Sequence, residues 1–134
     1  MRININTSEF MKTLSIALLL FFVTACSSST NNAYGQVVNK KVDKTEFSEL
    51  MKKPGAQLID VRTAREFSNG FIAGAKNVDY NGDSFEKQIK KLDKNKPVLV
   101  YCAAGGRSEN ATELLKELGF KEVYDLIGGY NDWK

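Results

Sequence analysis

Short apolar runs alternate with segments of helical spacing from residue 37 to residue 134, and this alternation restricts the fold more than any other feature. The apolar runs predict strands at residues 37–42, 56–61, 75–80, 97–102 and 121–126. Helices are predicted between these strands, with a closing turn or short helix at residues 128–134. Such alternation is typical of a parallel sheet covered on both faces. We therefore expect a small α/β domain, with a parallel sheet flanked by helices on both faces.

Local signals refine this outline. Capping boxes that begin at Asp43 and at Thr63 predict the starts of two helices, and residues 84–94 have helical spacing. The run 97–102 is continuously apolar with proline at its first position, which is typical of a buried central strand. The segment that follows this run has apolar residues at helical spacing and ends at Gly119, a residue that favours helix termination.

The first 25 residues have the pattern of a signal peptide. Lys12 precedes an apolar run of 12 residues, 14–25. That run suits a signal peptide better than a membrane span, which needs roughly 20 apolar residues. Met11 is an alternative start for the chain. An uncleaved membrane anchor and ordinary secretion are the alternative interpretations of this segment.

The end of this segment, Val23-Thr24-Ala25-Cys26, resembles the lipobox of bacterial lipoproteins. The resemblance implies that Cys26 carries lipid and becomes the first residue of the mature chain. Residues 26–36 would then be a polar, flexible tether to a domain at residues 37–134. We expect a lipid-anchored protein of the cell envelope, on the periplasmic side of the inner or outer membrane.

The chain contains no histidine, which excludes Ser-His-Asp and Cys-His catalysis and removes the commonest zinc ligand. The net charge of +3, with lysines scattered along the chain, does not indicate nucleic-acid binding. The chain has two cysteines, Cys26 and Cys102, which could form one disulfide. If Cys26 carries lipid, Cys102 has no partner within the chain.

Cys102 ends the best strand candidate, and ligands bind beyond the carboxyl ends of strands in open parallel sheets. We expect successive N–H groups of the loop after it to form an anion-binding nest. Arg107 would add a permanent cation, and Ser108 would cap the next helix. Such surroundings lower a thiol pKa, so Cys102 is the candidate nucleophile. The alternative is a buried cysteine that packs as a small apolar residue. The candidate substrate-binding residues are Ala103, Ala104, Gly105, Gly106, Arg107 and Ser108.

Residues 38–134 resemble a single-domain rhodanese, a sulfurtransferase fold. The stretch "LIDVRTAREFSNGFIAGAKNV" is similar to the first signature of that family, and "YCAAGGRS" matches its active loop of pattern Cys-x-x-Gly-x-Arg-Ser. The ending "GGYNDWK" matches its Gly-Gly-aromatic-x-x-Trp terminus. Phe71 stands where the family commonly has histidine, away from the loop, and we expect this difference to affect packing more than chemistry.

The resemblance implies that the Cys102 thiolate takes sulfane sulfur from a small anionic donor such as thiosulfate and holds it as a persulfide. Loop amides would stabilise the persulfide, and a thiol or protein cysteine would accept the sulfur. No cofactor is implied. The expected partners are thus the donor, the acceptor and, through the lipid, a membrane. A monomer is the expected state.

Three other interpretations remain. A phosphatase or arsenate reductase loop places five residues between cysteine and arginine, whereas four lie between them here. A non-catalytic binding module and a thiol redox relay are the other two. Asp60 and Arg62 end a predicted strand, and we expect them to fix the local backbone rather than to act in catalysis. The lysines between residues 87 and 96 are expected to form a solvated helix face.

Overall fold

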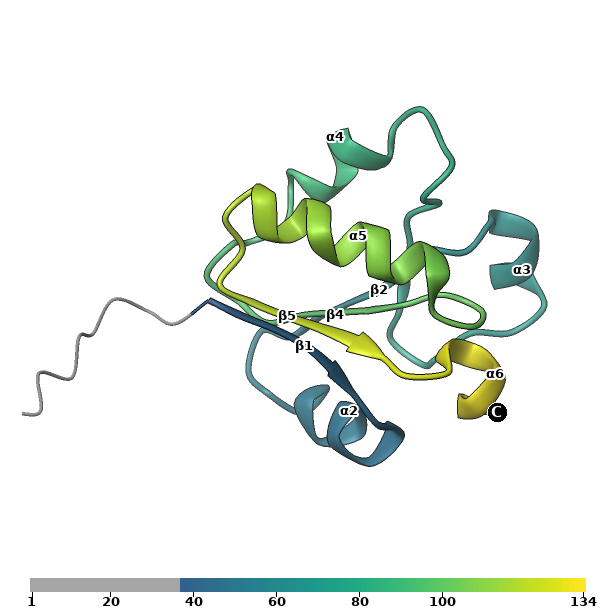
Figure 1. Ribbon diagram of the computed structural model, residues 1–134. Coiled ribbons are helices and arrows are strands. Elements are labelled where there is room, and N and C mark those ends of the chain that lie inside the picture. The colour runs from purple at the N-terminus through teal and green to yellow at the C-terminus, as the bar shows by residue number, and fades with distance from the viewer. Residues whose placement is uncertain (1–36) are drawn as a thin grey trace, which may run out of the picture. The chain divides into compact units, whose positions relative to one another are not determined.

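The computed structural model describes residues 37–134, so the predicted signal peptide, the lipidation of Cys26 and the tether at residues 26–36 lie outside the described residues. Five strands form the sheet: β1 (Val38–Val42), β2 (Gln57–Asp60), β3 (Lys76–Asn77), β4 (Val98–Tyr101) and β5 (Glu122–Leu126). All paired strands are parallel, in the order β1-β5-β4-β2-β3 (Figure 1). The predicted parallel α/β architecture is confirmed.

The helices are α2 (Lys44–Leu50), α3 (Ala64–Ser68), α4 (Phe85–Ile89), α5 (Gly106–Glu117) and α6 (Gly129–Trp133). Figure 1 shows α4 and α5 on one face of the sheet and α2 on the other. Ile89 and Ala111 pack with Val100 on the first face, and Phe47 packs with Tyr101 on the second. Successive residues of a strand point to opposite faces, so β4 supplies both apolar clusters.

β4 lies between β5 and β2, and all four of its residues are 0 % exposed. This burial explains the continuous apolar run, because a strand covered on both faces gains from an apolar side chain at every position. Pro97 directly precedes the strand, and its carbonyl accepts a hydrogen bond from the Gln57 N–H at 2.9 Å. Proline is therefore tolerated at this position, because the neighbouring strand β2 uses its carbonyl group as an acceptor and needs no N–H donor from it.

Most predicted helix boundaries are found in the structure. The Asp43 carboxylate accepts a hydrogen bond from the backbone N–H of Glu46 at 2.9 Å at the start of α2. A reciprocal capping box of Thr63 and Glu66 begins α3. Helix α4 ends at Ile89, so the helix predicted over residues 84–94 was too long; its second half forms turns.

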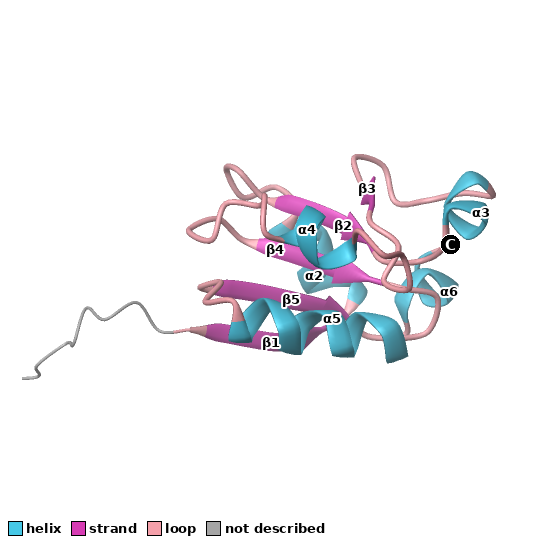
Figure 2. Ribbon diagram, turned by 90° about the horizontal axis from the view of Figure 1, so that it is seen from above, coloured by secondary structure: helices cyan, strands magenta, loops and turns pink. Residues whose placement is uncertain are grey.

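The loops at the carboxyl edge of the sheet lie beside the short helices α3 and α6 (Figure 2). No side chain of α3 is buried, so this helix lies at the edge of the core. Within residues 37–134, no helix is both long enough and apolar enough to cross a membrane.

Candidate active site

Cys102 directly follows β4 at the carboxyl edge of the sheet and is only 2 % exposed. Its Sγ atom accepts a hydrogen bond from the Gly105 N–H at 3.0 Å. The Ser108 hydroxyl lies 3.5 Å from the same sulfur. The loop between β4 and α5 therefore curls around the sulfur atom and directs donors toward it.

The backbone of this loop is held from outside by α6. The N–H of Tyr130 donates to the carbonyl of Cys102 at 2.8 Å, and the N–H of Asn131 donates to the carbonyl of Ala103 at 3.0 Å. In a trans peptide the N–H points opposite to the carbonyl. With both carbonyls turned toward α6, the N–H groups of Ala103 and Ala104 point away from that helix, toward the interior of the loop.

Gly105 makes the turn that starts α5. It is the N-cap residue of this helix and has φ = +116°, a conformation that strongly favours glycine. A Cβ atom at Gly106, the first residue of the helix, would meet no atom within 4 Å. The loop is thus open to solvent at Gly106, beside the enclosed sulfur atom.

The surroundings of Cys102 favour its thiolate form. Burial, the largest influence, raises the pKa of the thiol. Hydrogen bonds from the Ser108 hydroxyl and from the N–H groups of Ser108, Gly105 and Ala104 lower it. The net result is a pKa below the ordinary value of 9.0. The structure therefore agrees with the predicted lowering of the thiol pKa. Backbone N–H groups and a hydroxyl group produce this lowering without a histidine.

Arg107 faces a partner that the sequence did not reveal. Its guanidinium group donates to both carboxylate oxygens of Glu66 in α3, with two distances of 2.7 Å. Arg107 is the largest influence that lowers the pKa of Glu66, to about 2. The negative charge of Cys102 also raises the pKa of Arg107, after the larger influence of Glu66. The cation predicted beside the sulfur is thus shared with a carboxylate.

The expectation that Ser108 caps the helix was wrong. Helix α5 begins earlier, at Gly106, because Gly105 supplies the left-handed turn that ends the loop. Ser108 consequently lies in the first turn, where its hydroxyl is fully buried and lies 3.0 Å from the carbonyl of Gly105. The side chain contacts the sulfur instead of capping the helix.

Asp60 and Arg62 form a buried pair that fixes the backbone, as expected. Arg62 Nη2 is 2.6 Å from Asp60 Oδ2 and donates to the carbonyl of Gly70 at 2.8 Å. The guanidinium group also lies over the ring of Tyr130, 4.1 Å from its centroid. This pair joins β2, the chain after α3, and α6, and both side chains are almost fully buried.

Sequence reasoning missed two features that surround the loop, the Glu66 carboxylate and the N-terminal N–H groups of α6. Glu66 was noticed only as part of a capping box, and the N-terminal N–H groups of α6 were not considered. Gly129 precedes these groups, and a Cβ atom there would lie 2.5 Å from the carbonyl oxygen of Cys102. Consecutive glycines at residues 128 and 129, after a strand and before an aromatic residue, were the available signal for this close approach.

Phe71 lies in the chain between α3 and β3. Its ring stacks on Phe67, with 4.2 Å between ring centroids and 14° between planes, and the side chain is 48 % exposed. Within the part of the chain that the structure describes, no three side chains of Cys, Asp or Glu are grouped as metal ligands.

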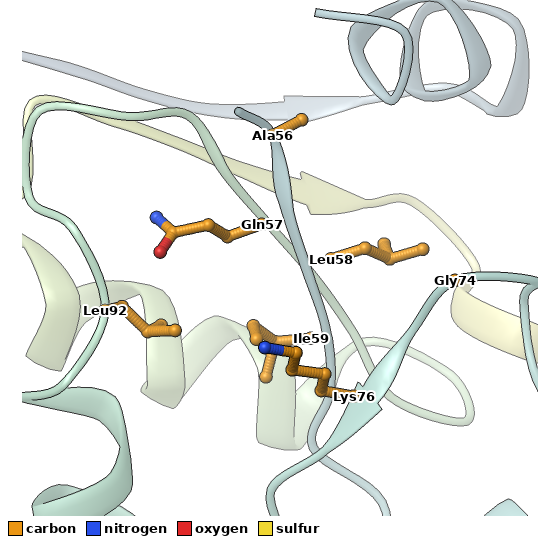
Figure 3. A pocket seen from close by; sticks show the side chains of 7 residues that line it. All are labelled: Ala56, Gln57, Leu58, Ile59, Gly74, Lys76 and Leu92. Carbon is orange, nitrogen blue, oxygen red and sulfur yellow. The ribbon is translucent and has the colours of Figure 1, made fainter. Parts of the chain in front are cut away.

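A separate cavity of about 120 Å³ lies beside β2 and β3 (Figure 3). Leu58, Ile59 and Leu92 give it an apolar side. The side-chain amide of Gln57 is occupied, because it donates to the carbonyl of Asp93 and accepts from its N–H, both at 2.9 Å. Lys76 adds one charged side chain, so the cavity offers no group of catalytic residues.

Comparisons with known proteins agree with this geometry. The model of the rhodanese-like domain family matches residues 43–134. The thiosulfate sulfurtransferase GlpE of Coxiella burnetii is 40 % identical over 95 residues, which cover 71 % of this chain and 87 % of that protein. The uncharacterized protein YqhL of Bacillus subtilis is 33 % identical over 118 residues, which cover 88 % and 90 % of the two chains.

Solved structures give the same result. A rhodanese-like domain protein from Staphylococcus aureus has a TM-score of 0.63 and 28 % identity, over 72 % of this chain and 92 % of that one. A rhodanese-related protein from Thermoplasma volcanium has a TM-score of 0.62 and 29 % identity, over 71 % and 90 %. The family match, the sequence relatives and the shared fold together show that this chain belongs to the rhodanese-like domain family.

Proposed function

We propose that this protein is a sulfurtransferase that carries sulfane sulfur as a persulfide on Cys102. The proposal depends most on the surroundings of the Cys102 sulfur atom. The loop after β4 encloses this atom, the Gly105 N–H donates a hydrogen bond to it at 3.0 Å, and the pKa of the thiol is lowered. A relative at 40 % identity is named a thiosulfate sulfurtransferase, which supports thiosulfate as the donor class.

The first half of the reaction needs a nucleophile and a leaving group. The Cys102 thiolate attacks the outer sulfur of thiosulfate, an S–S bond forms, and the S–S bond of thiosulfate breaks. Sulfite leaves with the electron pair of the broken bond, and the enzyme keeps a persulfide anion. The new terminal sulfur lies about 2 Å beyond Sγ. The N–H groups of residues 103–107 and the Ser108 hydroxyl are the donors proposed to stabilise this anion.

The second half returns the cysteine to its starting state. An acceptor thiolate attacks the terminal sulfur, takes it as a new persulfide, and Cys102 leaves as the thiolate. Neither half requires a metal or an organic cofactor. Because a good leaving group departs in each half, no imidazole is needed to protonate it, which suits a chain without histidine.

We also propose that the domain is held at the cell envelope. The support is the sequence: a short apolar run ends in a lipobox-like Val23-Thr24-Ala25-Cys26. Cys26 would carry the lipid and the domain would lie on the periplasmic side of the inner or outer membrane, as a monomer. Mass spectrometry of the protein from membranes tests this directly, because a lipidated Cys26 has a defined added mass and a Cys26→Ser chain lacks it.

The activity is tested with purified protein and its Cys102→Ala variant. Each protein is incubated with thiosulfate, and its intact mass is then measured. Cyanide is added afterwards, and the formation of thiocyanate is followed. We expect the unmodified protein to gain the mass of one sulfur atom from thiosulfate and then to produce thiocyanate over many turnovers. The Cys102→Ala variant should do neither. Protein that stays unmodified by thiosulfate and by a polysulfide would refute the enzyme and favour a binding module. A mixed disulfide without sulfur uptake would instead support a redox relay.

A further inference from the structure

Arg107 is the only cation among residues 102–108, and a carboxylate already binds its side chain. Nη1 and Nη2 of Arg107 donate to Oε2 and Oε1 of Glu66, with both distances at 2.7 Å. Such a bidentate pair uses the edge of the guanidinium group that otherwise receives an anionic ligand. The positive charge of Arg107 is therefore balanced before any sulfur donor binds.

The carboxylate of Glu66 is fixed in place by the start of its own helix. Its Oε2 atom also accepts hydrogen bonds from the N–H group of Thr63 at 3.0 Å and from the Thr63 hydroxyl at 2.8 Å. These contacts belong to the capping box of α3, so turning the carboxylate away would break the cap of that helix. With a pKa lowered to about 2, chiefly by Arg107, Glu66 carries its negative charge at neutral pH.

Two other cations at this edge of the sheet are paired as well. Arg62, which follows β2, pairs with the buried Asp60 at 2.6 Å. Lys41 of β1 pairs with Glu109 in the first turn of α5 at 2.8 Å. These ion pairs add no net charge beside the sulfur. The groups that remain in contact with the sulfur are N–H groups of the loop and of the start of α5 and one hydroxyl, and a helix start carries only about half a unit of positive charge.

The pair of Glu66 and Arg107 lies beside the open side of the loop. The loop is open at Gly106, where a Cβ atom would meet no atom within 4 Å, and Arg107 is the next residue. The side chains of Arg107 and Glu66 are 25 and 35 % exposed. A donor that approaches the sulfur past Gly106 therefore meets both charges at short range, where salt screens them least.

We propose that Glu66, through Arg107, makes this site favour sulfur donors with one negative charge over donors with two. The partial charges of the loop N–H groups match one negative charge. A second negative charge finds Arg107 already paired and is repelled by Glu66. Glu66 is a positioning residue, because it binds Arg107 and not the sulfur. The favoured donors are monoanions of the type R–S–S⁻ or R–SO₂–S⁻, whereas thiosulfate is a dianion.

Thiosulfate and methanethiosulfonate are matched probes for this preference. Each carries its outer sulfur on an oxidised sulfur atom, but thiosulfate has two negative charges and methanethiosulfonate has one. With either probe the Cys102 thiolate forms a bond to the outer sulfur and the S–S bond of the donor breaks. Sulfite or methanesulfinate leaves with the electron pair, and the total charge is unchanged. The ratio of kcat/KM for thiosulfate to kcat/KM for methanethiosulfonate therefore reports the effect of the second charge.

We expect Glu66→Gln to raise this ratio about three- to tenfold, because it removes one unit charge beside a partly exposed site. Glu66→Asp keeps the charge and should keep the ratio within about twofold. Glu49→Gln is the matched control and should also leave the ratio unchanged. Glu49 lies near the end of α2, which returns from β1 to the start of the parallel strand β2, at the edge of the sheet opposite the loop. An unchanged ratio in Glu66→Gln, or an equal rise in either of the other variants, overturns the proposal.

Because this inference rests on the proposed sulfur transfer, a second measurement avoids that dependence. Cys102 is alkylated either by iodoacetamide, which is neutral, or by iodoacetate, which has a similar size and one negative charge. The mass of the peptide that contains Cys102 gives both rates, and their ratio does not depend on the fraction of thiolate. Glu66→Gln should raise the ratio of the iodoacetate rate to the iodoacetamide rate about three- to tenfold. If neither sulfur donor reacts and this ratio still rises, the proposed function fails and the charge selection by Glu66 stands.

If Glu66→Gln does not fold, the unmodified protein decides the question. Salt weakens the attraction of an anion to an unbalanced cation but has little effect where the charges already cancel. The ratio of the iodoacetate rate to the iodoacetamide rate should therefore change less than about threefold between about 0.01 and 0.5 M salt. A larger fall would reveal an unbalanced cation beside Cys102 and would refute the proposal.

Discussion

The ion pair between Glu66 and Arg107 fastens α3 to the first turn of α5, and its contribution to stability can be worked out. The pKa of Glu66 falls from 4.5 to about 2 in the folded protein. Each pH unit of difference corresponds to about 1.4 kcal/mol, which gives roughly 3 kcal/mol for this carboxylate. The two side chains remain 35 and 25 % exposed, so solvent screening reduces the figure. We expect Glu66→Gln to lower the free energy of unfolding by about 1–2 kcal/mol at neutral pH.

The sign of the pH dependence follows from the lowered pKa. The pair stabilises the folded state fully above the unfolded pKa of 4.5. The stabilisation is lost as the pH falls through the folded value of about 2, because the carboxyl group is then protonated in both states. The difference between the unmodified protein and Glu66→Gln should therefore shrink from pH 5 to pH 2, by about the amount stated above.

Urea unfolding at several pH values measures this difference. Glu49→Gln serves as the matched control, because Glu49 pairs with Lys52 at a similar distance of 2.7 Å but both side chains are about two-thirds exposed or more. We expect the control to lose less than about 0.5 kcal/mol at every pH. Equal losses for the two variants at neutral pH would refute the reasoning, and so would a Glu66→Gln deficit that persists undiminished at pH 2.

Two further predictions concern the loop. Gly129→Ala should destabilise the fold more than Gly119→Ala, in thermal unfolding, by about 1–3 kcal/mol. Both glycines have positive φ, 59° and 84°, but only at Gly129 would a Cβ atom strike the carbonyl of Cys102, at 2.5 Å; equal effects would exclude the contact as the cause. Ser108→Ala should raise the pKa of the Cys102 thiol, because it removes a hydrogen bond that lowers it. The midpoint of alkylation by iodoacetamide should then move to higher pH, and an unchanged or lower midpoint would contradict the assigned contact.

Local patterns predicted the fold well because short-range signals agreed. The apolar run of β4, the capping box of α3 and the stop at Gly119 each depend on residues within a few positions of one another. The position of Cys102 followed from the same patterns, since a parallel strand fixes where its carboxyl end lies. The helix predicted over residues 84–94 was too long because Leu92 continues the helical spacing of Phe85 and Ile89, and that spacing does not show where the helix ends.

The contacts around the sulfur could not be predicted in the same way. Glu66 and Arg107 are 41 residues apart, and nothing near either one indicates the other. The hydrogen bond from Tyr130 to Cys102 depends on how α6 docks, a tertiary arrangement.

The common direction of the five strands has a practical consequence for work with this protein. The chain enters β1 at Val38, at the amino edge of the sheet, whereas Cys102 lies at the carboxyl edge. A strand of five residues separates these edges by about 16 Å. An attachment before residue 37 therefore joins the domain at the edge of the sheet opposite the reactive loop. An attachment to Lys134 begins at the end of α6, the helix whose backbone N–H groups bind the carbonyls of Cys102 and Ala103, and so joins the domain beside the reactive loop.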